Sequence, residues 1–278
     1  MFNHLHVERL IDLWLLEDVG HGDLTATLMV DEAAVATFDV NSRESMVVAG
    51  IDVMAMVFRR WEPRIVVTVQ RVDGSRVPAG TRLARVHGPA RGILTAERTA
   101  LNIMQRMSGI ATETARYVAE MGETRARLVD TRKTTPGLRM LEKHAVLCGG
   151  ASNHRLGLDS GIMLKDNHIA VCGSIAAAVA RARAAVPILT RIEVECDRLD
   201  QVDEALAAGA DVIMLDNMTL EEMRVAVARV AGRVPLEASG GVRFERVRAI
   251  AETGVDYISC GRLTQGSPAV DIGLDEPA

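Results

Sequence analysis

The chain carries the segment Val212-Ile213-Met214-Leu215-Asp216 ahead of an amphipathic stretch at 220–231 that ends at Gly232. An apolar run that ends in a carboxylate and precedes a glycine-capped amphipathic helix reads as one β/α unit. The same order recurs from Gly122 onward, in runs at 128–132, 154–158, 162–165, 192–195, 236–239 and 257–260. Such alternation predicts parallel strands with helical crossovers, most simply a closed or nearly closed barrel. Seven strands are countable, and an open doubly wound sheet is the competing architecture.

The residues at the ends of these runs are chemically unusual. In α/β barrels, catalytic residues sit at the C-terminal ends of the strands. Here those positions hold cations or His, two carboxylates and glycine turns: Arg132, Lys133, His154, Arg155, Lys165, Glu195, Asp216, Ser239-Gly240-Gly241 and Gly261. A turn could explain any one of them, but the set as a whole predicts an anion-handling site.

The use of lysine points to the same region. Only three of the 32 basic residues are lysines, Lys133, Lys143 and Lys165. Residues 125–168 hold eight Arg and Lys against four acids, a local charge of +4 within a chain of net charge −5. A lysine ammonium is a compact point charge, whereas an arginine guanidinium is a planar fork, so the few lysines indicate positions where arginine would not serve. The usual interpretation of such a charge run is a solvated basic face, and the more specific alternative is a concave pocket for a multiply anionic small molecule.

The bulk composition excludes several classes of protein. Aromatic residues make up 3% of the chain, too few for the stacking platforms of single-stranded nucleic-acid binding. The negative net charge disfavours DNA and anionic membranes. The four cysteines lack metal-ligand spacing, which indicates reduced thiols in a cytoplasmic protein. We expect no signal peptide and no membrane helix.

The first part of the chain has a different pattern. Residues 7–18 predict an amphipathic helix that stops at Gly20. Strand-like segments follow at 35–49, 64–72 and 82–87, with a helix at 51–61 between them, and a long helix at 93–120 leads into the β/α units. The sequence therefore predicts two parts: a first part of mixed strands and helices, and a second part of repeated β/α units.

Several motifs resemble the quinolinate phosphoribosyltransferases. They are Asp130-Thr131-Arg132-Lys133-Thr134-Thr135-Pro136-Gly137-Leu138-Arg139, Asn153-His154-Arg155-Leu156-Gly157-Leu158, Lys165-Asp166-Asn167-His168, 17–25, Ala96-Glu97-Arg98-Thr99, Leu215-Asp216-Asn217 and Ser239-Gly240-Gly241-Val242. The matches run in order along nearly the whole chain. The resemblance implies an incomplete seven-stranded α/β barrel with an N-terminal α/β sandwich domain. We expect the sandwich over 1–105, rejoined by 266–278, and the barrel over 106–265.

The resemblance also implies a reaction. Members join quinolinate to phosphoribosyl pyrophosphate with Mg²⁺ and release pyrophosphate and CO₂, giving nicotinate mononucleotide for NAD biosynthesis. By this resemblance, quinolinate would be held by Arg132, Lys133, His154, Arg155 and Lys165. Glu195 and Asp216 would face the ribose and the metal, and Ser239, Gly240, Gly241 and Gly261 would hold the 5′-phosphate. Lys133, Lys165, Glu195 and Asp216 are the catalytic candidates, and Arg98 would enter from the partner of a homodimer.

Some positions depart from the family pattern and keep alternatives open. Ala151-Ser152 and Arg262-Leu263-Thr264-Gln265-Gly266 replace its usual residues, so a paralogue with another azine carboxylate is one alternative. A molybdenum-cluster relative is disfavoured because the Lys165-Asp166-Asn167-His168 and Leu215-Asp216-Asn217 motifs are present. A Schiff-base aldolase using Lys165 and a non-catalytic nucleotide-binding module are the rivals. Lys143 is expected to be a solvated cation or to support the site from behind.

Overall fold

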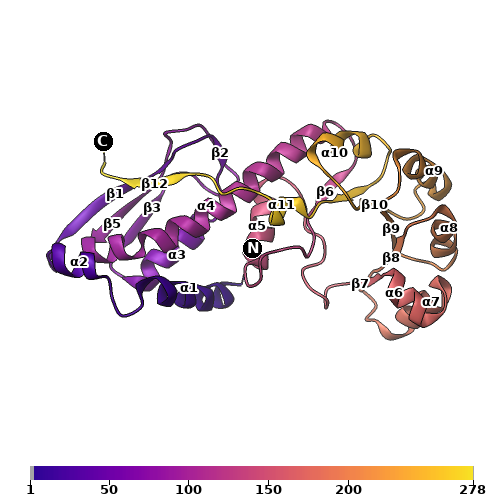
Figure 1. Ribbon diagram of the computed structural model, residues 1–278, viewed down its shortest axis with the longest axis horizontal. Helices are drawn as coiled ribbons and strands as arrows, with labels where there is room; N and C mark the ends of the chain where they lie inside the picture. The colour runs from indigo at the N-terminus through magenta and orange to yellow at the C-terminus, as the bar shows by residue number, and fades with distance from the viewer. Residues whose placement is uncertain (1–2, 278) are drawn as a thin grey trace. The chain divides into compact units, whose positions relative to one another are not determined.

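The computed structural model describes residues 3–277, which form two compact units (Figure 1). The first unit comprises the chain up to Ala115, residues 135–150 and the segment from Ser267 onward; the second comprises 116–134 and 151–266. The mixed α/β architecture confirms the fold class predicted from the sequence.

The first unit contains an antiparallel sheet of four strands in the order β12-β1-β5-β3. Its strands are β1 (Val35–Ser42), β3 (Val66–Val69), β5 (Arg82–Pro89) and β12 (Ile272–Asp275). A separate pair joins β2 (Met46–Val47) to β4 (Arg76–Val77). The central pair β1 and β5 runs from Val35 opposite Pro89 to Asn41 opposite Arg82. Asp39 on β1 is buried and forms ion pairs with Arg82 and Arg85 of β5, which ties the two strands together.

Helices with one apolar face cover this unit. They are α1 (His4–Val19), α2 (Leu24–Met29), α3 (Ile51–Trp61), α5 (Arg139–Cys148) and most of α4 (Ala90–Met121). Helix α1 buries Val7, Ile11 and Leu15, spaced four residues apart, and packs against α3. As expected, Gly20 ends α1.

The C-terminal segment joins the first unit at two places. Strand β12 pairs with β1, with Val40 opposite Leu274. The backbone of Pro268 also lies against Gly109 of α4, so closely that no side chain fits at position 109. Both contacts hold the end of the described chain within the first unit.

The second unit is built on six parallel strands in the order β6-β11-β10-β9-β8-β7. They are β6 (Arg127–Val129), β7 (Ile162–Leu164), β8 (Ile192–Cys196), β9 (Val212–Asp216), β10 (Leu236–Ser239) and β11 (Tyr257–Ser259). Among the described residues β6 and β7 do not pair, so the barrel is incomplete. A single parallel bridge joins Val129 to Ser152 at the β6 edge.

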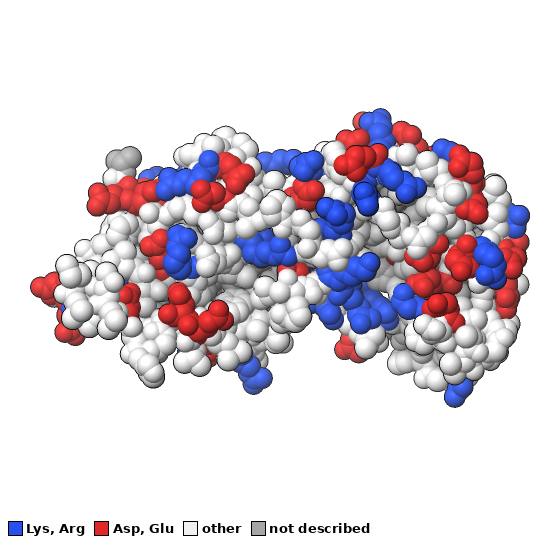
Figure 2. All heavy atoms as spheres, viewed as in Figure 1, with Lys and Arg blue, Asp and Glu red and all other residues white. Residues whose placement is uncertain are grey.

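Helices lie on the outside of this curved sheet (Figure 1). They are α6 (Asp166–Cys172), α7 (Ile175–Ala185), α8 (Leu199–Ala207), α9 (Leu220–Val230) and α10 (Phe244–Ala251). The short α11 (Arg262–Gln265) instead borders the cavity at the ends of the strands. Charged side chains of both signs mix over α8 and α9, where Arg229 pairs with Asp203 (Figure 2). Across residues 3–277, no helix combines the length and hydrophobicity needed to span a bilayer.

One local expectation was wrong, and one of the two alternatives for Lys143 is excluded. The segment 154–158 forms no strand, because Asn153 and His154 are instead anchored to Asp130 through hydrogen bonds. Lys143 is not solvated: it is 1% exposed inside the first unit, on the face of α5 that also buries Glu142. Glu142 accepts a hydrogen bond from Arg106 at 2.8 Å, so α5 brings charged side chains into that interior.

Candidate active site

One cavity of about 680 Å³ opens at the C-terminal ends of the six parallel strands. It lies wholly within the second unit. Eleven of the residues predicted for the site line it: Arg132, Lys133, His154, Arg155, Lys165, Glu195, Asp216, Ser239, Gly240, Gly241 and Gly261. The parallel strands bring them together because these residues end or follow several different strands, whose C-terminal ends meet at one edge of the sheet.

Three charged residues come from consecutive strands. Lys165 follows β7, Glu195 lies near the end of β8, and Asp216 ends β9. Lys165 Nζ lies 2.5 Å from Glu195 Oε2. Asp216 Oδ2 accepts a hydrogen bond from Asn217 Nδ2 at 2.8 Å, which fixes the orientation of that carboxylate. The cavity is thus lined by cations and carboxylates together, with Lys165 in direct contact with Glu195.

A buried carboxylate positions the loop that carries His154. Asp130, which follows β6, is completely buried. It accepts hydrogen bonds from Asn153 Nδ2 at 2.6 Å and from the backbone N–H of His154 at 2.9 Å. Because ionised acceptors make the stronger hydrogen bonds, this anchor holds the 153–155 segment against the end of β6.

At the cavity wall, His154 lies between two glutamates. Its Nε2 is 3.2 Å from Glu193 Oε2 on β8 and 3.2 Å from Glu237 Oε2 on β10. Burial opposes a charge on the imidazole, but the hydrogen bonds to both carboxylates and their charge outweigh it and raise the pKa of His154 to about 10. Burial and the charge of Glu237 raise the pKa of Glu193, while His154 lowers it. The second oxygens of both glutamates have no hydrogen-bond partner within residues 3–277.

The backbone N–H of Arg155 points at His154 Nδ1 across 2.7 Å, which works against a proton on that nitrogen. The hydrogen bonds at Nε2 and at Nδ1 involve different nitrogens, and the tautomer with its proton on Nε2 satisfies both. What favours the doubly protonated imidazolium is the negative charge of the two glutamates, which raises the pKa of His154. His154 then adds positive charge to the floor of the cavity.

Two arginines add to the positive potential. Burial and the neighbouring charge of Arg132 lower the pKa of Arg155. Like charges placed this close repel each other, and a bound dianion relieves the repulsion. The arrangement is therefore suited to a ligand with two negative charges.

The glycine turn after β10 is required by its surroundings. Gly240 has φ +87°, and a Cβ there would collide with the side chain of Asn217. Asn217 itself has φ +56°, a conformation that Asn tolerates better than most residues. The backbone of 239–241 thus borders the cavity next to Asp216, with which Ser239 is in register.

Arg98 is the one predicted site residue that does not line this cavity. It lies on α4 in the first unit, where it is exposed and pairs with Glu97 at 2.9 Å.

Sequence reasoning missed several residues of the site. Arg243 lines the cavity, as do Arg262 and Gln265, which had been noted only as departures from the family pattern. The glutamates around His154 were also overlooked. A signal existed for one of them, since Glu193 and Glu195 are two positions apart on one strand and therefore point to the same side.

Comparisons with known proteins agree with this geometry. The profile of the quinolinate phosphoribosyl transferase C-terminal domain matches residues 110–275, and that of the N-terminal domain matches 23–108. The chain is 42% identical to a probable carboxylating nicotinate-nucleotide pyrophosphorylase of Bacillus subtilis over 273 residues, covering 98% of this chain and 94% of that protein. It is 45% identical to the carboxylating nicotinate-nucleotide pyrophosphorylase of Mycobacterium leprae over 269 residues, 94% of each.

A solved structure gives the same result in three dimensions. The nicotinate-nucleotide pyrophosphorylase of Francisella tularensis superposes with a TM-score of 0.96 at 40% identity, covering 99% of this chain and 97% of the other. The matches extend over both units and retain the order of the motifs. This chain therefore belongs to the quinolinate phosphoribosyltransferase family.

Proposed function

We propose that this chain transfers the phosphoribosyl group of phosphoribosyl pyrophosphate to quinolinate, with loss of CO₂, in the cavity of the second unit. The observation that carries the proposal is the convergence of Arg132, Arg155 and Lys165 with Glu195 and Asp216 on one space. A volume of about 680 Å³ falls within the range of about 300–1,000 Å³ typical of small-molecule sites.

The positive wall would bind quinolinate. Its two adjacent carboxylates suit guanidinium groups, which bind carboxylates bidentately, and the ammonium groups of Lys133 and Lys165. His154, charged by its two glutamates, would face the same dianion. These groups would orient the ring nitrogen toward C1′ of the ribose.

The carboxylates would serve the transfer step. As the bond from C1′ to pyrophosphate breaks, positive charge develops on the ribose, and Glu195 and Asp216 would stabilise it electrostatically. The nitrogen lone pair forms the new bond to C1′, and pyrophosphate leaves with the electron pair. The ribosylated ring then carries a positive nitrogen, which accepts the electrons left when the 2-carboxylate departs as CO₂. A proton replaces it at that carbon.

The same carboxylates fit a magnesium ion. Their oxygens are hard donors, and two of them line one open space where water and pyrophosphate oxygens could complete the shell. We propose that Glu195 and Asp216 hold Mg²⁺, directly or through water. When bound, the ion would neutralise charge on the departing pyrophosphate.

The backbone at Ser239, Gly240, Gly241 and Gly261 would bind the 5′-phosphate, in the region where many barrels bind one. Arg243 and Arg262 border the same turns and would add charge there. Arg98 is exposed on the first unit and lies outside the cavity of its own chain, which supports a role in a site of another chain. We propose a homodimer in which each chain lends Arg98 to the partner's cavity.

Of the rivals, the aldolase is disfavoured by the contact of Lys165 with Glu195. An amine nucleophile needs the neutral form, and a carboxylate at 2.5 Å suits an ammonium that binds anions.

The deciding experiment uses quinolinate labelled in its 2-carboxylate. The protein, phosphoribosyl pyrophosphate and Mg²⁺ should release labelled CO₂ and form nicotinate mononucleotide, and leaving out phosphoribosyl pyrophosphate should stop the release. Absence of both products from folded protein would reject the proposal. A borohydride-trapped imine with a carbonyl substrate would favour the aldolase instead.

A further inference from the structure

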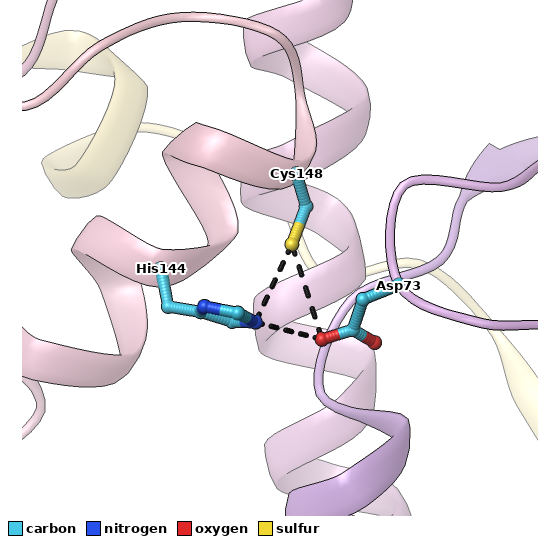
Figure 3. Close-up of side chains that lie close together, drawn as sticks. All are labelled: Asp73, His144 and Cys148. Carbon is cyan, nitrogen blue, oxygen red and sulfur yellow. Dashed lines mark hydrogen bonds and ion pairs between the residues drawn. The ribbon is translucent and has the colours of Figure 1, made fainter. Parts of the chain in front are cut away.

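The first unit contains a cluster of Asp73, His144 and Cys148 that the proposed reaction does not use (Figure 3). His144 and Cys148 lie four residues apart on α5, so both side chains project from one face of that helix. Asp73 approaches from the turn before β4. All three side chains are partly buried.

The potential ligand atoms are close together. His144 Nε2 is 2.8 Å from Asp73 Oδ2 and 3.5 Å from Cys148 Sγ, and Cys148 Sγ is 3.9 Å from the same Asp73 oxygen. Figure 3 shows the three groups facing a common point. A tetrahedral zinc ion binds nitrogen and oxygen at about 2.0–2.2 Å and sulfur at about 2.3 Å, which places its ligand atoms about 3.2–3.6 Å apart. The three observed distances between ligand atoms, 2.8, 3.5 and 3.9 Å, span this range.

The surrounding backbone holds Asp73 in this orientation. Its Oδ1 accepts the N–H of Ile51 at 3.1 Å, at the start of α3, so Oδ2 is directed toward α5. The turn is closed by hydrogen bonds from Ser75 N to Val72 O at 3.1 Å and from Gly74 N to Val48 O at 2.8 Å. The hydrogen bond from Ile51 to the Asp73 carboxylate is of the kind that commonly orients a carboxylate ligand in a metal site.

We propose that Asp73 Oδ2, His144 Nε2 and Cys148 Sγ form a binding site for one thiophilic divalent cation of the zinc type. The donor set of thiolate, imidazole and carboxylate selects Zn²⁺ or Co²⁺ over Mg²⁺, which prefers oxygen ligands. The site is separate from the magnesium site proposed above in residues, in ligand chemistry and in the unit of the chain that holds it.

Metal binding changes the protonation of two ligands. The Cys148 thiol loses its proton to solvent and binds as a thiolate, while the proton of the neutral imidazole, which lies on Nε2 toward Asp73, moves to Nδ1 and frees the Nε2 lone pair for the ion. One proton is therefore released for each ion bound. Without a metal, burial and the Asp73 charge raise the pKa of Cys148 to about 12, so the thiol is a poor nucleophile despite its nearby His.

The bound ion would link the end of α5 to the 72–75 turn, and Asp73 links that turn to the start of α3 through its hydrogen bond to Ile51. We therefore expect the ion to increase the stability of the first unit.

The test uses Co²⁺ as the probe, with full-length protein kept reduced by a phosphine. One equivalent should produce the near-ultraviolet sulfur-to-cobalt charge-transfer absorption, and Zn²⁺ should abolish it by displacement. Cys148→Ser should remove the absorption. His144→Gln, which keeps every thiol, should weaken Zn²⁺ binding at least tenfold in a chelator competition. Zn²⁺ should raise the melting temperature of the parent protein but not of Cys148→Ser.

Cys172→Ser is the matched control. His168 and Cys172 have the same four-residue spacing on α6, yet within the described part of the chain no acidic ligand completes a metal-binding group with them. This variant should bind like the parent. The proposal is overturned if the parent shows no charge-transfer absorption at one equivalent, if the absorption survives Cys148→Ser, or if Cys172→Ser removes it. These readouts need no substrate, so a failed turnover assay leaves them unaffected.

Discussion

Lys165 and Glu195, from neighbouring parallel strands, form an ion pair of 2.5 Å at the edge of the cavity. Lys165 is 45% exposed, so its contribution to stability is small, about 0–1 kcal/mol for an exposed pair. A charge held in place but open to the cavity is available to a ligand. The pair can therefore be tested for a role in turnover separately from a role in folding.

Lys165→Arg should reduce kcat/KM by about 10²-fold or more, because a planar fork cannot replace a compact ammonium at this position. Its melting temperature should stay within a few degrees of the parent's. Arg198→Lys, in an exposed ion pair outside the cavity, is the control and should change neither quantity. An active Lys165→Arg enzyme would remove Lys165 from the catalytic candidates.

Arg98→Ala and Arg132→Ala should each abolish turnover when pure. Mixed and allowed to exchange subunits, they should regain up to about a quarter of parental activity, because a dimer of one chain of each kind holds one intact site. The measurement is the rate of CO₂ release before and after mixing. If activity stays at zero in proven heterodimers, Arg98 does not act across an interface.

Nicotinate should be a poor substrate, with kcat/KM at least about 10²-fold below that of quinolinate. It lacks the 2-carboxylate, so part of the positive charge of the cavity would have no anionic partner when nicotinate is bound. Competition between the two compounds measures the difference directly. Equal turnover would show that the cavity does not select a dianion and would point to a paralogue.

The imidazole of His154 should stay doubly protonated through neutral pH, as ¹⁵N chemical shifts can show. Its folded-state pKa of about 10 lies above the ordinary 6.5. Its charge therefore adds stability that is complete below pH 6.5 and is lost as the pH rises through 10. Glu237→Gln should lower the pKa of His154, because one of the two negative charges beside the imidazole is removed. A neutral His154 at pH 7 would contradict the assignment.

Much of the catalytic unit could be predicted because its signals are local. Each strand is a short apolar run, and the sequence shows directly which residue follows it. Because parallel strands end at the same edge of the sheet, Lys165, Glu195 and Asp216 could be predicted to lie at one end of the barrel. The glycines at 240 and 241 were predictable for the same reason.

The failures involve tertiary contacts. Segment 154–158 has the composition of a strand, but its backbone is held by Asp130, a partner more than twenty positions away. Lys143 looked solvated because periodicity does not reveal which face of a charged helix is covered. Nor does the sequence show that His144 and Cys148 meet Asp73, since that contact joins residues about seventy positions apart.

The pairing of β12 with β1 affects how the chain acquires its structure during synthesis. Asn41 and Asp275 bond across 234 positions, so the first sheet cannot gain its outer strand until the ribosome has passed the entire barrel. Domains generally fold as units while the polypeptide emerges. The barrel strands can thus assemble while the earlier-made sheet still exposes the β1 edge. A chaperone that shields such an edge, or a stalled ribosome that leaves it open, would act on the part of the molecule that was translated first and completed last.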